Sequence, residues 1–402
     1  MSKVKILQLC NKAPYPANDG SSIAIYNMAN GLLDNQIELH LLTINTKKHY
    51  KPTNEIPKDF LDNTHYQAVY KNTNTSFFGM LGNLFSNKSY FESRFYFQVF
   101  ENTLISKLQD TTFDVIQLEG LFMCCYLETI RKYSSAKIIL RAHNIEHIIW
   151  ERHIESEKNP FKRFYLKIQT KRLKKSELRA FNEVDAIVPI TSIDEQWILQ
   201  SVPRTKCKTI LTGINLHDYP VETTAHHNEK SLFFFGSMDW LPNQQAVHWF
   251  LDKCWNKILQ QVPECTLVIA GRNIPDFIKK LDSQKILIKE NVADSKEIYT
   301  NYNIMIVPLQ SGSGLRIKIV EGLAFGKAIV STHIGAEGIP LCSGENSILE
   351  NNPEAFADQI IRLLTETDLL TNIQRGARKF AEEHLDNQKI TKELVAFYQS
   401  LN

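Results

Sequence analysis

The chain has 402 residues, with 46 Lys plus Arg against 44 Asp plus Glu and a formal net charge of +2. Hydrophobic residues make up 43% and charged residues 22% of the chain, proportions that exclude intrinsic disorder, collagen and long coiled coils. At about 100–200 residues per domain the length predicts two or three domains, and the near-neutral charge gives no reason to expect a nucleic-acid partner.

The seven cysteines indicate a reducing compartment. Their number is odd, most lie in apolar runs and no C-x-x-C occurs, which fits neither a disulfide framework nor a zinc site. The N-terminus is interrupted by Lys5 and Gln8, so it does not resemble a signal peptide. No apolar run reaches the ~18 residues of a membrane span. We therefore expect a cytoplasmic protein.

In the first half, short apolar runs alternate with longer stretches of helical period, the pattern of parallel βαβ units. The first predicted helix is Ser22–Asn35, and the polar, Asn-rich stretch Lys51–Lys88 is expected to hold loops. The predicted strands are Lys5–Leu9, Glu38–Thr43, Val115–Leu118, Lys137–Leu140, Ala186–Ile190 and Lys208–Leu211.

The second half repeats the alternation and ends in two or three helices. A helix is predicted from Pro242 to Gln261, where proline suits the first helical turn, and another over Leu315–Phe325. The predicted strands are Ser231–Phe235, Thr266–Ala270, Ile286–Lys289, Ile304–Pro308 and Ala328–Ser331.

These elements predict two doubly wound, Rossmann-like α/β domains, residues 1–212 and 231–385, that face each other across a cleft. The stretch 213–230 between them lacks periodicity and contains Gly213 and Pro220, so it is the predicted linker. Ligands of such sheets bind beyond the carboxyl ends of the strands. Candidate site residues are therefore sought directly after each strand.

The strongest candidate site follows the predicted strand Ile304–Pro308. Gly312, Ser313 and Gly314 let the backbone approach a ligand, and the helix that follows offers free N–H groups to an anion. Arg316 and Lys318 are predicted in its first turn, where positive charge opposes the helix dipole. A bound phosphate group would resolve that conflict. The alternative is a solvated helix start with incidental charges.

Glu321 extends this candidate site. It lies three residues after Lys318, so the same helix face presents both side chains. A carboxylate at this place can accept two hydrogen bonds from a vicinal diol such as that of a ribose.

Three further segments carry polar candidates. The loop 11–22 ends in Gly20 and two serines at a helix start, which suits a phosphate or a sugar, although an ordinary capped connector explains it too. His143 follows the strand Lys137–Leu140, and Glu119 holds the matching place on the neighbouring strand. Both side chains can bind hydroxyls or transfer protons, but either can equally be a satisfied polar residue.

The segment 161–180 holds eight Lys or Arg against the single Glu177, with aromatic residues interleaved. A solvated helix face is the simpler interpretation. The alternative is a surface that meets anionic lipid or a pyrophosphate-linked acceptor.

Some absences also discriminate between function classes. No Asp-x-Asp pair occurs, so the usual carboxylate pair that holds a metal–diphosphate complex is missing. Neither a P-loop nor a G-x-S-x-G elbow is present, which weighs against a P-loop ATPase and an α/β-hydrolase.

Nearly the whole chain resembles a retaining glycosyltransferase of family 4 with the GT-B fold. Three motifs of the second half carry the resemblance: 235–243 (FGSMDWLPN), 312–321 (GSGLRIKIVE) and 331–338 (STHIGAEG). In the first half the matching segments are the loop 18–20 (NDG) and residues 143–146 (HNIE).

The resemblance implies hexosyl transfer from a nucleoside-diphosphate sugar to a hydroxyl of a glycan or lipid-linked acceptor, in polysaccharide biosynthesis, with retention at the anomeric carbon and no metal or other cofactor. The donor would lie against the second domain and the acceptor against the first, and residues 386–402 would return to the first domain as a helix. Peripheral contact with a membrane through the segment 161–180 would suit a lipid-linked acceptor.

The implied residue roles follow the matching motifs. Where many members of the family have an acidic residue, this chain has Ser313; where they have a histidine, it has Glu119, which leaves His143 as the alternative histidine. The implied catalytic residues are His143, Glu119, Arg316 and Lys318. The implied donor-binding residues are Gly20, Gly312, Ser313, Gly314, Arg316, Lys318 and Glu321.

Other functions on such a scaffold stay open. A nucleotide-sugar epimerase would need no separate acceptor, and a phosphorylase would use phosphate as the acceptor. A non-catalytic nucleotide-sugar-binding subunit of a polysaccharide assembly would bind the donor without turnover. A dehydrogenase is disfavoured because the G-x-G-x-x-G fingerprint is missing.

Overall fold

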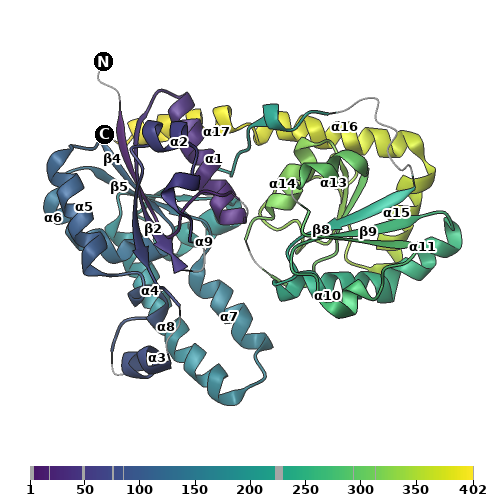
Figure 1. Cartoon of the computed structure of the whole chain (residues 1–402), viewed down its shortest axis with the longest axis horizontal. Helices are drawn as coiled ribbons and strands as arrows, with labels where there is room; N and C mark the ends of the chain where they lie inside the picture. Colours follow the sequence, from purple (N-terminus) through teal and green to yellow (C-terminus); the bar gives the residue numbers. More distant parts are fainter. Residues whose placement is uncertain are drawn as a thin grey trace. The chain divides into compact units, whose positions relative to one another are not determined.

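A computed structural model describes the chain except residues 1–3, 18, 48–49, 75–76, 85, 222–229, 293, 313 and 402. The chain forms two compact units: unit 1 is Met1–Gly213 with Asn387–Asn402, and unit 2 is Ile214–Asp386. Residues 222–229 of the predicted linker 213–230 lie outside the described residues. Each unit is an α/β domain built on one parallel sheet (Figure 1), which confirms the predicted fold class of two doubly wound domains.

Unit 1 contains a seven-stranded parallel sheet with the strand order β3-β2-β1-β4-β5-β6-β7. Alternate residues of each strand point to opposite faces, so Leu7 and Leu9 pack into one core while Ile6 packs into the other. The strands are β1 (Lys5–Cys10), β2 (Glu38–Thr46), β3 (Gln67–Lys71), β4 (Val115–Glu119), β5 (Lys137–Ala142), β6 (Ala186–Pro189) and β7 (Lys206–Cys207).

Helices cover both faces of this sheet (Figure 1). One core includes residues of α5 (Gln98–Asp110), α6 (Leu127–Tyr133), α8 (Pro160–Glu183) and α9 (Ser192–Ser201). The other includes residues of α1 (Gly20–Asp34), α2 (Lys58–Asn63) and α17 (Asn387–Gln399). The last helix therefore belongs to unit 1: Asn387 Nδ2 donates to the Asn27 carbonyl at 2.6 Å. Three further helices are α3 (Phe77–Leu84), α4 (Tyr90–Ser93) and α7 (Glu146–Ser156).

Unit 2 contains a six-stranded parallel sheet with the strand order β10-β9-β8-β11-β12-β13. Its strands are β8 (Ser231–Phe235), β9 (Thr266–Gly271), β10 (Ile286–Glu290), β11 (Ile304–Val307), β12 (Ala328–Ser331) and β13 (Ile348–Leu349). Its helices are α10 (Leu241–Phe250), α11 (Asn256–Gln261), α12 (Asp276–Lys279), α13 (Lys296–Asn301), α14 (Ile317–Ala324), α15 (Pro353–Thr365) and α16 (Thr367–His384).

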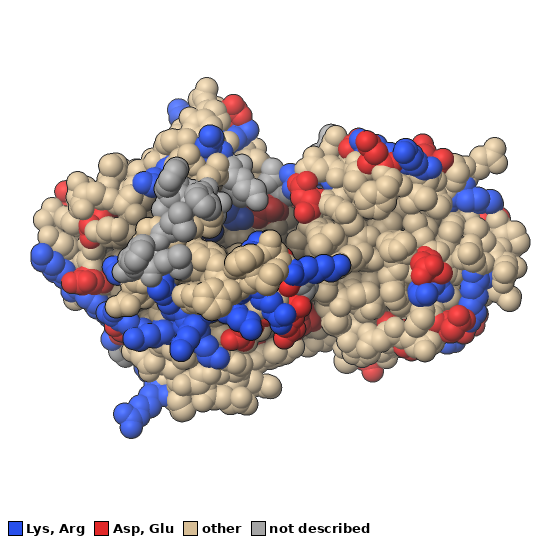
Figure 2. All heavy atoms as spheres, turned by 90° about the horizontal axis from the view of Figure 1, so that it is seen from below, with Lys and Arg blue, Asp and Glu red and all other residues tan. Residues whose placement is uncertain are grey.

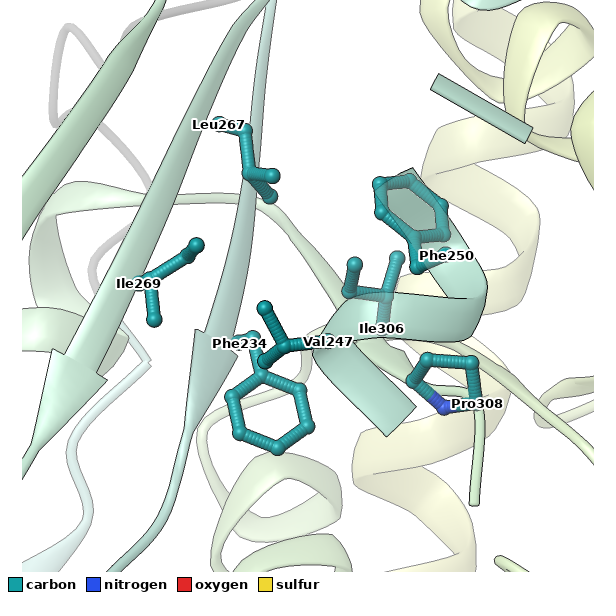
Figure 3. A pocket seen from close by; sticks show the side chains of 7 residues that line it. All are labelled: Phe234, Val247, Phe250, Leu267, Ile269, Ile306 and Pro308. Atoms are coloured by element: carbon teal, nitrogen blue, oxygen red, sulfur yellow. The ribbon is translucent and has the colours of Figure 1, made fainter. Parts of the chain in front are cut away.

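The two central phenylalanines of β8 face opposite layers of unit 2. The ring of Phe233 packs on Tyr299 of α13, whereas Phe234 lies with Val247 and Phe250 of α10 in a small pocket (Figure 3). All seven lining residues are apolar: Phe234, Val247, Phe250, Leu267, Ile269, Ile306 and Pro308. A nucleotide or sugar needs polar partners that these side chains lack, so this pocket is part of the hydrophobic core.

The structure corrects several predicted elements. Lys208–Leu211 is not a strand; β7 ends at Cys207, and the following backbone only continues to donate to β6, for example from Ile210 to the Pro189 carbonyl at 3.0 Å. The predicted loop region contains α2, the edge strand β3 and α3. The helix predicted from Pro242 to Gln261 is divided into α10 and α11 by a π-helical turn, Leu251–Trp255.

Candidate functional site

Two loops meet at the carboxyl edge of the sheet in unit 2. Strands β8 and β11 are neighbours, and the strand order reverses between them, which is where doubly wound sheets bind their ligands. The loop after β8 contains Gly236 and Trp240, and the loop after β11 leads to Arg316, the residue that caps α14. The glycine-containing segments that follow β8 and β11 therefore lie side by side.

Lys318 lies in the first turn of α14 and reaches across to the loop after β8. Its Nζ donates to Asn243 Oδ1 at 3.0 Å, and Asn243 Nδ2 donates to the Ser237 carbonyl at 2.7 Å. The amine also lies 4.5 Å from the ring centre of Phe234. A Cβ on Gly236 would lie only 2.8 Å from this amine and from Asn243 Nδ2, so a side chain there would displace both groups.

Arg316 lies beside Lys318 and is held by the two loops. Its guanidinium carbon is 5.0 Å from the ring centre of Trp240, within the range of a cation–π contact, and its Nη1 donates to the Gly314 carbonyl. Gly312 and Gly314 have φ of +119° and +79°, which glycine adopts without strain. Trp240 and the Gly314 carbonyl thus hold the Arg316 side chain from the two loops.

Glu321 occupies the next turn of α14 and is 9% exposed. Tyr299 OH donates to its Oε2 at 3.3 Å and to the Lys318 carbonyl at 3.0 Å. Burial raises the pKa of Glu321 to about 7, although the Tyr299 hydrogen bond opposes that shift. A ligand that donates hydrogen bonds to this carboxylate would stabilise its ionised form.

Lys318 is perturbed in the opposite direction. Burial, followed by the positive charge of Arg316, lowers its pKa to about 7. A dianionic ligand beside both groups would favour the charged amine. A cation and a carboxylate with strongly shifted pKa values on one helix, at the switch point of a sheet, are typical of a binding or catalytic site.

The structure changes the local geometry predicted for this helix. Arg316 is the N-cap of α14, with φ −87° and ψ 90°, and not a member of its first turn; only Lys318 lies within that turn. Ser313 lies outside the described residues. No acidic residue occupies the first turn, so this helix end keeps its preference for an anion.

In unit 1, Glu119 and His143 are in contact, although the family resemblance presents them as alternatives for the role of one histidine. His143 Nε2 lies 2.7 Å from Glu119 Oε2, and Gln8 Nε2 donates to Glu119 Oε1 at 2.5 Å. Burial favours the protonated carboxyl, but the hydrogen bond and charge of His143, aided by Arg141 and Gln8, hold the pKa of Glu119 below its usual value. An ionised carboxylate only accepts hydrogen bonds, so Nε2 of His143 carries the proton of this contact and Nδ1 is the ring nitrogen left for a ligand.

Gly20 is the first residue of α1, beside the N-cap Asp19. Asp19 Oδ1 accepts from the backbone N–H groups of Ser21 and Ser22 at 3.1 Å, and it forms an ion pair with Lys12. A carboxylate thus already occupies two of the free N–H groups at this helix end, which leaves Gly20 a smaller role with an anion than its sequence position predicts.

Within the ranges that the structure describes, no three His, Cys, Asp or Glu side chains gather to hold a metal ion. Metal independence stays a prediction. Over the same residues, none of the helices is both long and apolar enough to cross a bilayer. The predicted compartment stays untested.

Several residues that hold the site were missed. Asn243 and Trp240 lie inside the motif 235–243, but nothing in that motif shows that they contact α14. Tyr299 comes from α13 and gives no sequence signal. In unit 1, Gln8 and Gln117 are polar residues inside buried strands, a pattern that could have marked them because buried polar groups require partners.

Known proteins are similar to this chain both in sequence and in three-dimensional structure. Residues 229–366 match the family model described as "Glycosyl transferases group 1". An uncharacterized 44.6 kDa protein in the cps region of Klebsiella pneumoniae is 22% identical over 402 residues, covering 96% of this chain and 97% of its own length.

Among solved structures, Anabaena Alr3699/HepE in complex with UDP matches with a TM-score of 0.67 and 15% identity, over 99% of this chain and 100% of that chain. HepE was also solved with UDP-glucose. Sucrose-phosphate synthase from Thermosynechococcus elongatus matches with a TM-score of 0.70 and 12% identity, over 99% of each chain. These structures show the GT-B fold, and together with the family match they support a glycosyltransferase.

Proposed function

We propose that the chain is a retaining glycosyltransferase of the hexosyltransferase type. It transfers a sugar from a nucleoside-diphosphate sugar to a hydroxyl of a glycan or lipid-linked acceptor, without a metal ion. The observation that carries the proposal is the cluster of Lys318 and Glu321 on α14 with Arg316 at its N-cap, inside the region 229–366 that matches the group 1 glycosyltransferases.

The chemistry of this cluster suits a nucleoside-diphosphate sugar. Arg316 offers a planar pair of donors, Lys318 a compact charge, and the start of α14 its free N–H groups, all of which can hold a diphosphate. Glu321 can accept hydrogen bonds from a ribose diol. The solved structures of HepE with UDP and UDP-glucose support a donor of this class here.

These residues would also promote bond cleavage. When the bond between the anomeric carbon and the diphosphate breaks, negative charge develops on the leaving oxygen. Preorganised cations and helix amides stabilise that charge, which is often the largest single catalytic contribution. Because Glu321, the carboxylate of this cluster, is assigned to the ribose and not to the anomeric carbon, we propose attack of the acceptor on the same face, with the leaving phosphate taking the acceptor proton.

The Glu119–His143 pair gives unit 1 a polar group for the acceptor. His143 is 11% exposed and Glu119 is fully buried beneath it, so the imidazole presents its remaining nitrogen while the carboxylate fixes its orientation. We propose that His143 accepts a hydrogen bond from a sugar hydroxyl and that Glu119 positions it. The relative from the cps region agrees with a role in polysaccharide biosynthesis.

A turnover assay tests the proposal against its alternatives. The enzyme is incubated with UDP-glucose in EDTA, with and without octyl glucoside as an acceptor that carries free sugar hydroxyls. We expect UDP release that depends on the acceptor, and an α-linked product by NMR. Conversion of the donor into another UDP-sugar without acceptor would indicate an epimerase, and a glucose phosphate formed only with inorganic phosphate would indicate a phosphorylase. Nucleotide binding without turnover would indicate a binding subunit.

Glu119→Gln tests the acceptor-side pair. The amide keeps the volume of the carboxylate but loses its charge and can donate to His143. We expect kcat to fall about tenfold, the equivalent of one charge-assisted hydrogen bond of ~1.5 kcal/mol, while the donor affinity of unit 2 stays unchanged. The half-buried Glu101, hydrogen-bonded to Thr129, gives the control Glu101→Gln. An unchanged kcat in Glu119→Gln would remove this pair from the mechanism.

A further inference from the structure

The helical hairpin formed by α7 and α8 carries exposed phenylalanines and a row of cationic side chains. Figure 1 shows it extending below the sheet of unit 1, and Figure 2 shows Lys and Arg side chains gathered on the face seen from that side. The hairpin is fixed near the sheet by Glu177, whose carboxylate accepts from the backbone N–H groups of Glu146 and His147 at 2.8 and 3.1 Å. Its far end is therefore presented by a rigid support.

Two phenylalanines stand exposed at that far end. Phe161 is 86% and Phe164 is 68% exposed, and Phe164 is the third residue after Phe161, so they lie about one turn apart on α8. Asn159 caps this helix by accepting from the N–H groups of Phe161 and Lys162 at 3.0 and 3.1 Å, and Pro160 occupies the first turn. Fixed, adjacent and exposed apolar rings of this size mark an interaction surface.

Five cations continue from the phenylalanines along the same helix. They repeat at every fourth residue and are all exposed: Arg163, Lys167, Lys171, Lys175 and Arg179. We call these five residues the cationic row. Like charges four residues apart repel each other and destabilise a helix, so the row gains from an external anionic partner.

Internal ion pairs do little to neutralise the cationic row. Arg179 pairs with Glu183 at 2.7 Å, and beside the row Lys162 pairs with Glu157 at 2.5 Å. Among the residues that the structure describes, no carboxylate forms an ion pair with the other four members: Arg163, Lys167, Lys171 and Lys175. These four charges are available to a partner.

We propose that this hairpin is a peripheral membrane anchor for an anionic lipid surface. Phe161 and Phe164 enter the boundary between headgroups and acyl chains, and the cationic row pairs with lipid phosphates, a combination typical of interfacial helices. A membrane would present a lipid-linked acceptor to unit 1, and in this respect the inference rests on the proposed function. The apolar rings favour a bilayer over a soluble polyanion, which offers no acyl layer.

Vesicle co-sedimentation of the full chain tests the anchor. The probes are phosphatidylcholine vesicles and vesicles of phosphatidylcholine mixed with phosphatidylglycerol. We expect binding only to the anionic vesicles, a loss of about 100-fold in Lys167→Gln/Lys171→Gln/Lys175→Gln from the three removed charges, and a loss of about tenfold or more in Phe161→Ala/Phe164→Ala.

Matched variants of exposed residues in other parts of the chain serve as controls. Phe277→Ala removes a ring that is 56% exposed on α12, and Lys253→Gln/Lys280→Gln/Lys392→Gln removes three exposed cations; both should bind vesicles as the wild type does. The proposal is overturned if the phenylalanine variant keeps full binding, if free inorganic phosphate displaces the vesicles, or if single-stranded RNA is bound in their place.

Nucleotide binding measured on the same samples separates this inference from the proposed function. The variants of the hairpin should bind UDP-glucose as the wild type does, because the donor cluster lies in unit 2. If the wild type binds vesicles but no nucleotide, the proposed transfer fails and the anchor stands. If it binds nucleotide but no anionic vesicles, the anchor alone fails.

Discussion

Replacing Lys318 by methionine is expected to lower the rate of sugar transfer by about 10²–10³-fold, the usual cost of removing one group aimed at developing negative charge. The fold should tolerate the change. Burial already lowers the pKa of this amine to about 7, so an apolar side chain of similar length replaces a charge that the unliganded protein holds at a cost. The measurement is UDP release from UDP-glucose, compared with the free energy of unfolding in urea.

Two further variants define the interpretation. Lys253→Met removes an exposed lysine from the same unit and should leave the rate unchanged. Asn243→Ala removes the oxygen that accepts from Lys318 and should lower the rate less than Lys318→Met does, because the charge remains but loses its support. A Lys318→Met enzyme with the wild-type rate and stability would exclude the amine from the diphosphate site.

The affinity for the donor is expected to be greatest near pH 7 and to fall on both sides. Above pH 7 Lys318 loses its proton in the free protein, so binding must take a proton up and the affinity falls by up to about tenfold per pH unit. Below pH 7 Glu321, whose pKa is raised to about 7 by burial, becomes protonated and loses its capacity to accept two hydrogen bonds. UDP-glucose suits this test because neither of its esterified phosphates titrates near pH 7.

Calorimetry in two buffers of different ionisation enthalpy measures the proton count directly. Proton uptake above pH 7 should vanish in Lys318→Arg, because arginine stays charged over this range. Proton release below pH 7 should vanish in Glu321→Gln. A donor affinity that stays flat from about pH 6 to about pH 9 would show that neither group meets the ligand.

The sequence predicted the architecture well where strands are buried on both faces. Runs such as Phe233–Phe235 and Ile304–Val307 are continuously apolar, and this is how buried parallel strands read. At the sheet edges it predicts β10 but misses β3 and β13. The strand β3 (Gln67–Lys71) is half exposed and polar, so it lacked both the apolar run and a clean alternation, and it was assigned to a loop.

The candidate site was predictable as far as one segment of chain reached. The residues between Gly312 and Glu321 share one loop and one helix, so their types and spacing indicated an anion and a diol. The contacts that support these residues could not be predicted, because Asn243 and Tyr299 come from other segments of the chain: Asn243 and Lys318 are 75 positions apart. The N-cap position of Arg316 depended on where α14 begins, which is the least certain feature of a sequence-based helix.

The contact between Glu119 and His143 could have been predicted from the positions of the two residues in the sequence. Glu119 is the last residue of β4 and pairs with Arg141 of the neighbouring β5, two residues before His143. Residues that follow neighbouring parallel strands lie at one edge of the sheet. Treating them as alternatives for one role therefore missed that they act on each other.

Nucleotide binding to unit 2 tests the central claim most directly. The protein, in EDTA, is heated with UDP, GDP, ADP, CMP or NAD, and the Tm is compared with that of Arg316→Ala. A ligand at about 100 times its Kd adds ~2.7 kcal/mol to the free energy of unfolding. We predict that one nucleoside diphosphate raises the Tm of the wild type and leaves that of Arg316→Ala unchanged. Stabilisation by NAD alone, or an equal shift in both proteins, would contradict the account.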